Sequence, residues 1–327
     1  MPTPASVSSH DPYLATLGAA SIDADLGGKG ASLDRLARLG HPIPPGFCLT
    51  AAAFRAYLAA AAEPDALATA IAALPDEAAR CEIVAALDAT AMPPAVGESI
   101  RAGLAALCTE LRGISSDPAD PSGDRPTFAV RSSALDEDGV DASFAGLHET
   151  ELGRTADEVE DAVRRCWRSL WSTAAVGYRA RRGLPFDGIA MAVVVQALVP
   201  AEASVVVFTR HPVSGRDDVL INAIRGLGEP LVSGTATPET IVVERSGRTI
   251  IERIPGDHGR RLFAHAGIPV EMADPSTDPV LTDGAACDLA GIALDIEAGL
   301  GRPVDIEAVR YRDRWLLLQA RPITTGR

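Results

Sequence analysis

The chain has 327 residues, of which 47% are hydrophobic, and its formal net charge is −14. This length is enough for two lobes with a core each, and the negative charge argues against non-specific binding to nucleic acid or to an anionic membrane surface. The N-terminal residues lack the features of a signal peptide, no apolar run is long enough to cross a membrane, and the five cysteines include no C-x-x-C pair. We therefore expect a globular protein of the cytoplasm, with neither a disulfide framework nor a zinc site.

Lys29 is the only lysine, because the other 29 of the 30 basic residues are arginines. A composition with this bias favours arginine wherever any cation suffices. A lysine that persists is expected where function needs a compact ammonium on a thin stem. Chance is the alternative explanation, since a single lysine has to fall somewhere.

The first half of the chain is predicted to be mainly helical. A glycine-rich turn around Lys29 leads into a short helix with leucines at helical spacing, which ends at Gly40. Thr50 is a predicted N-cap for a helix over residues 51–62, and residues 65–111 continue as helices with proline interruptions. These prolines are Pro75, Pro93 and Pro94.

Further along, residues 115–125 have the composition of a loop, and residues 127–131 have the pattern of a strand. Thr155 and Glu158 form a capping box that should open one long helix reaching Gly183. The second half is rich in β-branched residues, with predicted strands at residues 189–198, 203–208, 219–222 and 240–244. The change of character places two predicted lobes at residues 1–186 and 187–327.

A hairpin is predicted from residues 305–311 and 315–321, with its turn centred on Asp313. With that centre, Glu307 faces Gln319 and Asp305 faces Arg321, and these four polar side chains share one face because side chains alternate along a strand. The opposite face would carry apolar core residues. These are Ile306, Ala308, Leu316, Leu318 and Ala320.

The polar face of this hairpin has the chemistry of a metal and phosphate site. Glu307 and Gln319 offer oxygen ligands suited to magnesium, and the guanidinium of Arg321 suits a phosphate. The alternative is a solvated face with two cross-strand polar pairs. A slip of one residue in the register would put the groups on opposite faces.

Two nucleotide-binding motifs fail on inspection. Lys29 follows a glycine, as in a P-loop. That motif also needs glycine at position 23 and serine or threonine at position 30, where this chain has Asp23 and Gly30. The segment starting at Gly226 resembles the beginning of a dinucleotide fingerprint, but Leu231 stands at the third glycine position and no βαβ unit surrounds it.

Other polar groups are open to two interpretations. His148 and His211 could act as acid–base groups, or could be ordinary loop residues. The acidic loop over residues 136–141 lacks the spacing of a calcium-binding loop, and a solvated turn is the simpler interpretation.

Eight segments, in this order along the chain, together carry a resemblance. They are residues 27–31 (GGKGA), 44–47 (PPGF), 129–134 (AVRSSA), 143–146 (SFAG), 194–196 (VVQ), 222–234, 305–307 (DIE) and 317–324 (LLQARPIT). The combination resembles the N-terminal ATP-binding domain of the pyruvate phosphate dikinase and phosphoenolpyruvate synthase family, which also occurs in rifampin phosphotransferase.

The resemblance implies an α/β (α+β) fold of the ATP-grasp-like kind, with two lobes, a nucleotide cleft between them, and ATP with Mg²⁺ as cofactors. It implies a role for nine residues in total. The catalytic residues would be Lys29, Arg131 and Arg321; the nucleotide-binding residues Gly146, Thr150, Gln196 and Leu198; and the metal ligands Glu307 and Gln319.

By resemblance, the chain is a stand-alone phosphotransferase subunit that passes a phosphoryl group from MgATP to a histidine on a separate partner domain, leaving AMP. Family enzymes continue into a domain with a phosphorylated histidine, whereas this sequence stops at Arg327 and none of its six histidines lies in such a loop. Arg210, His211 and Arg225 also depart from the family pattern, which bears on the acceptor side.

Two other functions remain open from the sequence. The chain could be a kinase of a small molecule, with His148 or an acidic-loop carboxylate as the base and ADP as the product. It could also be a non-catalytic regulatory module that binds ATP. Neither nucleic acid nor a membrane is an expected partner.

Overall fold

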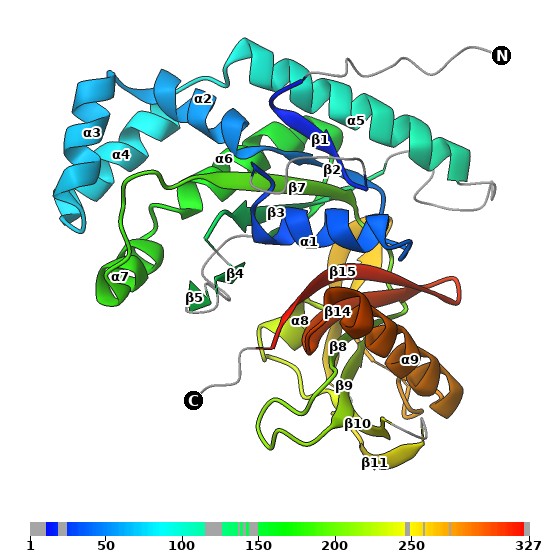
Figure 1. The fold of residues 1–327 in the computed structure, drawn as a ribbon. Coiled ribbons are helices and arrows are strands. Elements are labelled where there is room, and N and C mark those ends of the chain that lie inside the picture. Colours follow the sequence, from blue (N-terminus) through cyan, green and yellow to red (C-terminus); the bar gives the residue numbers. More distant parts are fainter. Residues whose placement is uncertain are drawn as a thin grey trace. The chain divides into compact units, whose positions relative to one another are not determined.

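A computed structural model describes residues 11–18, 25–114, 126–136, 138–139, 142–143, 150–245, 249–257, 259–274 and 276–323. The chain forms two compact units, and each has its own sheet (Figure 1). The first unit comprises Met1–Ala31 and Pro45–Ala197, and the second comprises Ser32–Pro44 and Leu198–Arg327. The mixed α/β architecture is the predicted one. Among the described residues, no helix combines the length and apolar character that crossing a membrane requires.

The first unit is built on a five-stranded antiparallel sheet with strand order β1-β2-β7-β3-β6. The strands are β1 (Leu14–Thr16), β2 (Gly46–Leu49), β3 (Phe128–Ala134), β6 (Thr150–Arg154) and β7 (Met191–Ala197). The predicted lobe boundary at residues 186/187 lies before β7, whereas the units divide after Ala197. The reason is that β7 hydrogen-bonds between β2 and β3, which makes it a central strand of the first sheet.

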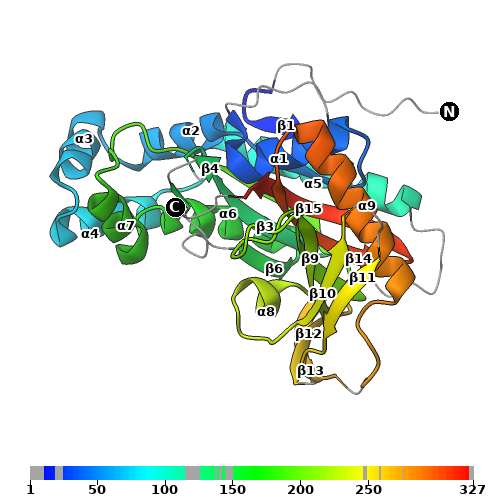
Figure 2. The same ribbon diagram turned by 60° about the horizontal axis from the view of Figure 1, so that its bottom comes forward.

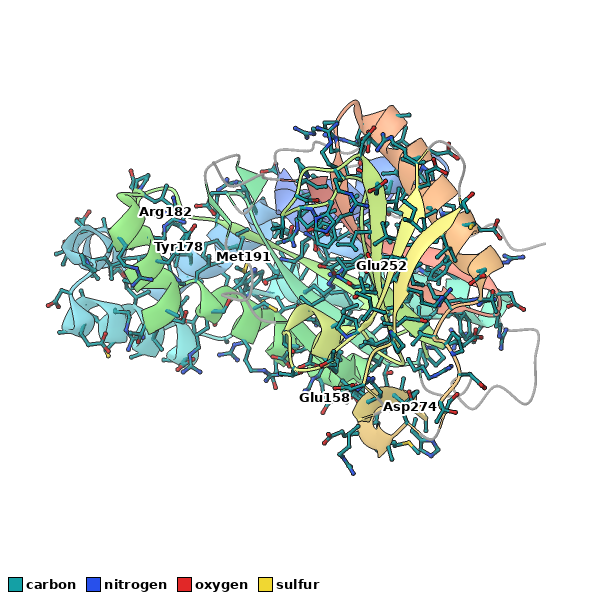
Figure 3. The ribbon with its side chains drawn as sticks, turned by 90° about the horizontal axis from the view of Figure 1, so that it is seen from below. Glu158, Tyr178, Arg182, Met191, Glu252 and Asp274 are labelled. Atoms are coloured by element: carbon teal, nitrogen blue, oxygen red, sulfur yellow. The ribbon has the colours of Figure 1, made fainter. Side chains whose placement is uncertain are left out.

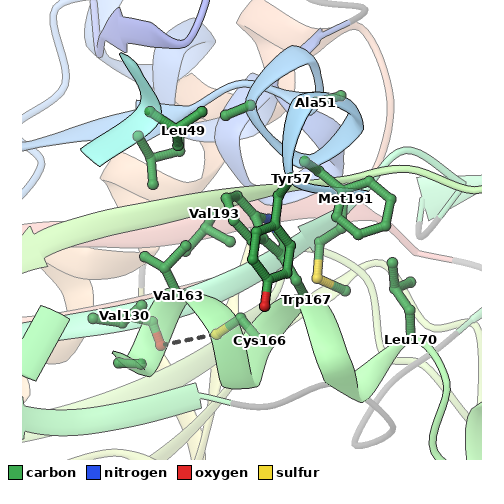
Figure 4. Close-up of a cluster of buried hydrophobic side chains, with 14 of the residues drawn as sticks. Leu49, Ala51, Tyr57, Val130, Val163, Cys166, Trp167, Leu170, Met191 and Val193 are labelled. Carbon is green, nitrogen blue, oxygen red and sulfur yellow. Dashed lines mark hydrogen bonds between the residues drawn. The ribbon is translucent and has the colours of Figure 1, made fainter. Parts of the chain in front are cut away.

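Helices cover one face of this sheet with a continuous apolar core. They are α2 (Ala51–Ala61), α3 (Pro64–Ala73), α4 (Glu77–Ala89), α5 (Pro94–Ile114), α6 (Val159–Ser169) and α7 (Thr173–Arg182). Trp167 of α6 is fully buried, with its ring centroid 5.9 Å from that of Phe54 and 5.1 Å from that of Tyr57 (Figure 4). The predicted proline interruptions are confirmed, since the helices separate at these positions.

The helix predicted from the capping box to Gly183 is two helices. The box itself is present, with the Thr155 backbone N–H donating to Glu158 Oε2 at 2.9 Å, and it opens a 3-10 turn that leads into α6. The chain then breaks at Leu170, and Ser172 caps α7 by accepting from the Ala175 N–H at 3.1 Å. On α7, the Arg182 guanidinium lies 5.6 Å from the centre of the Tyr178 ring (Figure 3).

Thr50 occupies the N-cap position of α2, as predicted, but its side chain does not cap the helix. Its hydroxyl instead donates to the Pro12 carbonyl at 2.6 Å, next to β1. The predicted loop over residues 115–125 lies outside the described residues.

The second unit has a six-stranded antiparallel sheet with strand order β11-β10-β9-β8-β14-β15. The strands are β8 (Ala203–Phe208), β9 (Asp218–Arg225), β10 (Glu239–Glu244), β11 (Ile250–Ile254), β14 (Val304–Tyr311) and β15 (Arg314–Pro322). A separate hairpin is formed by β12 (Arg260–His265) and β13 (Ile268–Ala273), and the short helix α8 spans Glu229–Val232.

Helix α9 (Asp283–Leu300), which the sequence analysis did not predict, packs along one face of this sheet (Figure 2). Its buried residues Leu289, Ala293 and Ile296 belong to the same apolar cluster as Val205 and Val207 of β8. The opposite face of the sheet therefore carries the alternate residues of each strand.

The hairpin of β14 and β15 pairs Asp305 with Arg321 and Glu307 with Gln319, as predicted. The predicted turn is wrong, because the loop contains two residues, Arg312 and Asp313, with φ of 49° and 59°. Two positive φ values define a type I′ turn. The register near this turn is shifted by one residue relative to the far end.

A bulge at Leu318 restores the register at the far end. Ala308 pairs with Leu317 and Glu307 pairs with Gln319, which leaves Leu318 as an extra residue in β15. Leu317 therefore lies in the core, 1% exposed, whereas the predicted core residues Leu316 and Leu318 are only partly buried. Ile306, Ala308 and Ala320 are in the core as predicted.

We expect Asp313→Gly to stabilise the protein by about 1 kcal/mol, because glycine adopts a positive φ without the Cβ penalty. Asp313 also forms an ion pair with Arg310 at 2.6 Å, but its side chain is 88% exposed, so the loss of the pair should cost little. Asp313→Ala is the control, since it loses the same ion pair and keeps the unfavourable φ. Equal urea midpoints for the two variants would contradict the turn assignment.

Candidate functional site

The face of the second sheet that lies away from α9 carries a row of polar side chains. Directly paired residues share a face, so Gln319, Glu307, Val206, Asn222 and Thr240 form one row across β15, β14, β8, β9 and β10. Gln319 is 3% exposed, and Glu307 and Asn222 are half-buried. The Thr240 hydroxyl donates to Asn222 Oδ1 at 3.0 Å. Neither Asn222 nor Thr240 was predicted as a site residue, although an isolated asparagine in an otherwise apolar strand is a recognisable signal.

Glu307 and Gln319 fit a magnesium ion as neighbouring ligands. They are directly paired on adjacent strands, and a carboxylate with an amide oxygen is a hard donor set. Among the described residues, no group of three or more His, Cys, Asp and Glu side chains could hold a metal. The pair is compatible with magnesium, which is commonly held by one or two protein side chains and keeps water and substrate phosphates in its coordination shell.

Arg321 lies next to this pair on the same face, two residues after Gln319. Its Nε donates to Asp305 Oδ2 at 2.7 Å, and the Asp305 side chain is 9% exposed, against 35% for Arg321. The predicted group of four polar side chains is therefore brought together on one face.

In the first unit, Lys29 lies in the first turn of α1 (Gly27–Arg38). The predicted placement, in a glycine-rich turn before the helix, is therefore wrong. The start of this helix packs closely on the first sheet. The Gly30 N–H donates to Ser133 Oγ at 3.0 Å, and that hydroxyl donates to the Leu26 carbonyl at 2.7 Å. Gly27 has a φ of +64°, and a Cβ added there would lie 2.5 Å from the carbonyl carbon of Ser133.

Arg131 and Gln196 lie on the same face of the first sheet as Ser133. Arg131 pairs with Val194 and Ala129 pairs with Gln196, so these residues alternate with the core residues of β3 and β7. Arg131 is 8% exposed and Gln196 is 2% exposed. The start of α1 rests on this face, because a Cβ added at Gly30 would lie 3.6 Å from Val194 and 3.1 Å from the sulfur of Cys48.

Thr150 begins β6 and pairs directly with Arg131. It is exposed and lines an open hollow of about 490 Å³. The other residues that line it are Glu151, Arg154, Glu158, Asp161 and Arg165. The lining combines three carboxylates with two arginines, and both arginines form ion pairs with Glu151. Hydrogen bonds from Thr155 lower the pKa of Glu158 and keep it charged.

Three predicted positions remain to be placed. Leu198 is half-buried and is the first residue of the second unit after β7. Gly146 and the candidate base His148 lie outside the described residues.

His211 and Arg225, which depart from the family's sequence pattern, have local structural roles. His211 Nδ1 accepts from the N–H groups of Val213 and Ser214, both at 3.2 Å, so this ring holds a turn. The Arg225 guanidinium donates to the carbonyls of Asp278 and Pro279, both at 2.9 Å, and so secures the segment before α9.

The segment that begins at Gly226 approaches the β12–β13 hairpin. The Leu227 N–H donates to the Leu262 carbonyl at 2.7 Å, and the Ser204 hydroxyl donates to the Gly226 carbonyl at 2.6 Å. Gly226 has a φ of +77°, and a Cβ added there would lie 3.2 Å from the carbonyl carbon of Leu262, so the close approach accounts for the glycine without a dinucleotide.

Comparison with known proteins identifies the family of the chain. The model of the family described as "Pyruvate phosphate dikinase, AMP/ATP-binding domain" matches residues 23–327. The chain belongs to this family. The family is ATP-grasp-like, which is the predicted fold class.

Proteins of similar sequence support this family assignment. The chain is 37% identical over 316 residues to a rifampicin phosphotransferase of Streptomyces and 36% identical over 312 residues to a probable phosphoenolpyruvate synthase of Archaeoglobus fulgidus. It is 33% identical over 342 residues to the phosphoenolpyruvate synthase of Pyrococcus furiosus. In each case 92% of this chain is covered, but only 34%, 40% and 42% of the respective relative.

We expect Gly27→Ala to weaken ATP binding by this domain at least about tenfold, because the added methyl group would displace the first turn of α1 from Ser133. Gly183→Ala is a matched control in the same unit, since Gly183 has a φ of +63° and nothing within 4 Å of an added Cβ. The control should lose about 1–2 kcal/mol of stability from its positive φ and keep its affinity for ATP. Titration calorimetry measures both affinities, and equal affinities would contradict the importance of this close packing.

Proposed function

We propose that the chain is the ATP-binding part of a phosphotransferase and that it cleaves MgATP to transfer a phosphoryl group. One observation carries the proposal. Glu307, Gln319 and Arg321 share one face of the β14–β15 hairpin in a chain of the AMP/ATP-binding family. Oxygen ligands for a metal beside a guanidinium for a phosphate are the groups that phosphoryl transfer needs.

The residues of the first unit would hold the phosphates. The Lys29 ammonium and the Arg131 guanidinium supply positive charge, and the start of α1 adds the partial positive charge of a helix N-terminus. Because a helix and a central strand carry these groups, they would face the transition-state charge with little movement of the backbone.

The residues of the second unit would hold the metal and the transferring group. Glu307 and Gln319 would bind magnesium, which neutralises charge on the phosphate oxygens, and Arg321 would contact the phosphoryl group that moves. Gln196 and the backbone at Leu198 would hold the adenine end, and Gly146 and Thr150 would lie over the phosphates. That both units serve one nucleotide is part of the proposal and rests on the family resemblance.

For the acceptor we propose a histidine on a separate domain. AMP is left because the bond between the α- and β-phosphates breaks and the two outer phosphates move to the histidine together. Water then releases the outer one as inorganic phosphate, and one phosphoryl group stays on the histidine. The support is that the chain spans well under half of the length of these relatives, two of which are phosphoenolpyruvate synthases by name. The cytoplasm, where ATP is supplied, is the proposed location.

Product analysis tests this reaction. With MgATP and a separately produced phosphohistidine domain from a related synthase, chromatography should show AMP, and the added domain should carry acid-labile phosphate on histidine. ADP together with a phosphorylated small molecule would favour a small-molecule kinase. Binding of ATP with no turnover under any of these conditions would favour a regulatory module.

We expect Lys29→Arg to keep the fold and lower kcat about 100-fold, because a planar guanidinium cannot take the place of a compact ammonium and displaces the phosphates. Arg35→Lys is the matched control, since Arg35 is exposed on the same helix. Circular dichroism and steady-state kinetics of the three proteins decide the point. A near-normal rate for Lys29→Arg would show that any cation serves there.

A further inference from the structure

We infer that Asp305 is a positioning residue that fixes the direction of the Arg321 guanidinium. This inference rests on the proposed function, since it assigns Asp305 a role toward the group that would contact the phosphoryl. Asp305 and Arg321 are directly paired on β14 and β15, and the Arg321 Nε–H donates to Asp305 Oδ2 at 2.7 Å.

The backbone around Asp305 makes it a fixed acceptor. It lies in the interior of the sheet, where β14 is paired with β8 on one side and β15 on the other. Asp305 is 7% exposed, so neighbouring atoms surround its carboxylate. Because this acceptor is charged, the hydrogen bond from Arg321 is stronger than one to a neutral acceptor would be.

The hydrogen bond to Asp305 comes from Nε of Arg321, and the two terminal nitrogens are the ones that would point toward a phosphate. A guanidinium is planar, and a phosphate is bound in a bidentate manner by two of its N–H groups. A bond through Nε fixes the plane of the group and the direction in which the two terminal nitrogens point. The free rotation of a long side chain, which otherwise has to be lost when the transition state forms, is then already restricted.

Asp305 also lies two residues from Glu307 on the same strand face, so its carboxylate could instead serve the metal. The two roles predict different effects. A metal ligand would change the magnesium concentration that gives half of the maximal rate. A positioning residue would change kcat and leave that concentration and the KM for ATP nearly unaltered, because misplacement of a catalytic group acts on the transition state.

The first test is kinetic. Asp305→Ala should lower kcat by about 10- to 100-fold with less than about a threefold change in the KM for ATP and in the half-saturating magnesium concentration. Asp305→Asn keeps an acceptor for Nε and should recover much of the loss. Asp218→Ala is the matched control, because Asp218 accepts from Arg216 Nε at 2.8 Å in the same unit and is outside the proposed site. A rise in the magnesium requirement, or equal losses in the alanine and asparagine variants, would overturn the positioning role.

The second test does not depend on turnover. In ¹⁵N spectra, the Nε–H signal of Arg321, assigned by its loss in Arg321→Lys, should exchange slowly with water and shift when a magnesium complex of a non-hydrolysable ATP analogue is added. In Asp305→Ala the signal should exchange faster. If calorimetry shows that the analogue binds but the signal does not respond, the positioning role alone is wrong. If the wild-type protein binds no nucleotide, the proposed function is wrong as well.

Discussion

The pairing register of β14 and β15 is the constraint on which the site of the second unit depends. Because side chains alternate, a shift of one residue along β15 would turn Gln319 and Arg321 toward the core beneath α9. Each buried polar group left without a partner there would cost about 1–3 kcal/mol. The type I′ turn imposes a register that differs by one residue from the register of the site, and the bulge at Leu318 reconciles the two.

The sequence predicted the paired residues of this hairpin but not the path of its chain. The central turn residues, Arg312 and Asp313, lack the glycine or asparagine that usually indicates positive φ, so the turn was placed one residue too wide. The bulge also left no signal, because the run Trp315–Leu318 is apolar throughout and has no alternation. The missed turn and the missed bulge shift the register in opposite directions, so the predicted pairing of Glu307 with Gln319 is correct. Between the turn and the bulge the prediction fails, and the core residue is Leu317 instead of Leu316 and Leu318.

Elsewhere, local signals predicted local structure and failed for contacts between distant segments. The capping box, the proline interruptions and most strand positions were recoverable, since each depends on a few adjacent residues. The place of β7 was not, because its partners β2 and β3 lie far away in sequence. The roles of His211 and Arg225 were likewise hidden, because the backbone groups that they bind are brought to them by the fold.

The position of Lys29, the only lysine, depends on how closely the first turn of α1 packs on the sheet. Gly27 and Gly30 allow the first turn of α1 to rest directly on Ser133, Val194 and Cys48, so the Cα of Lys29 is held close to the sheet. Arg131 reaches the same face from a central strand and is itself almost buried. A compact ammonium on a thin stem needs less room beside such a close backbone contact than a planar guanidinium does, and this is the physical reason that we propose for a lysine at this position.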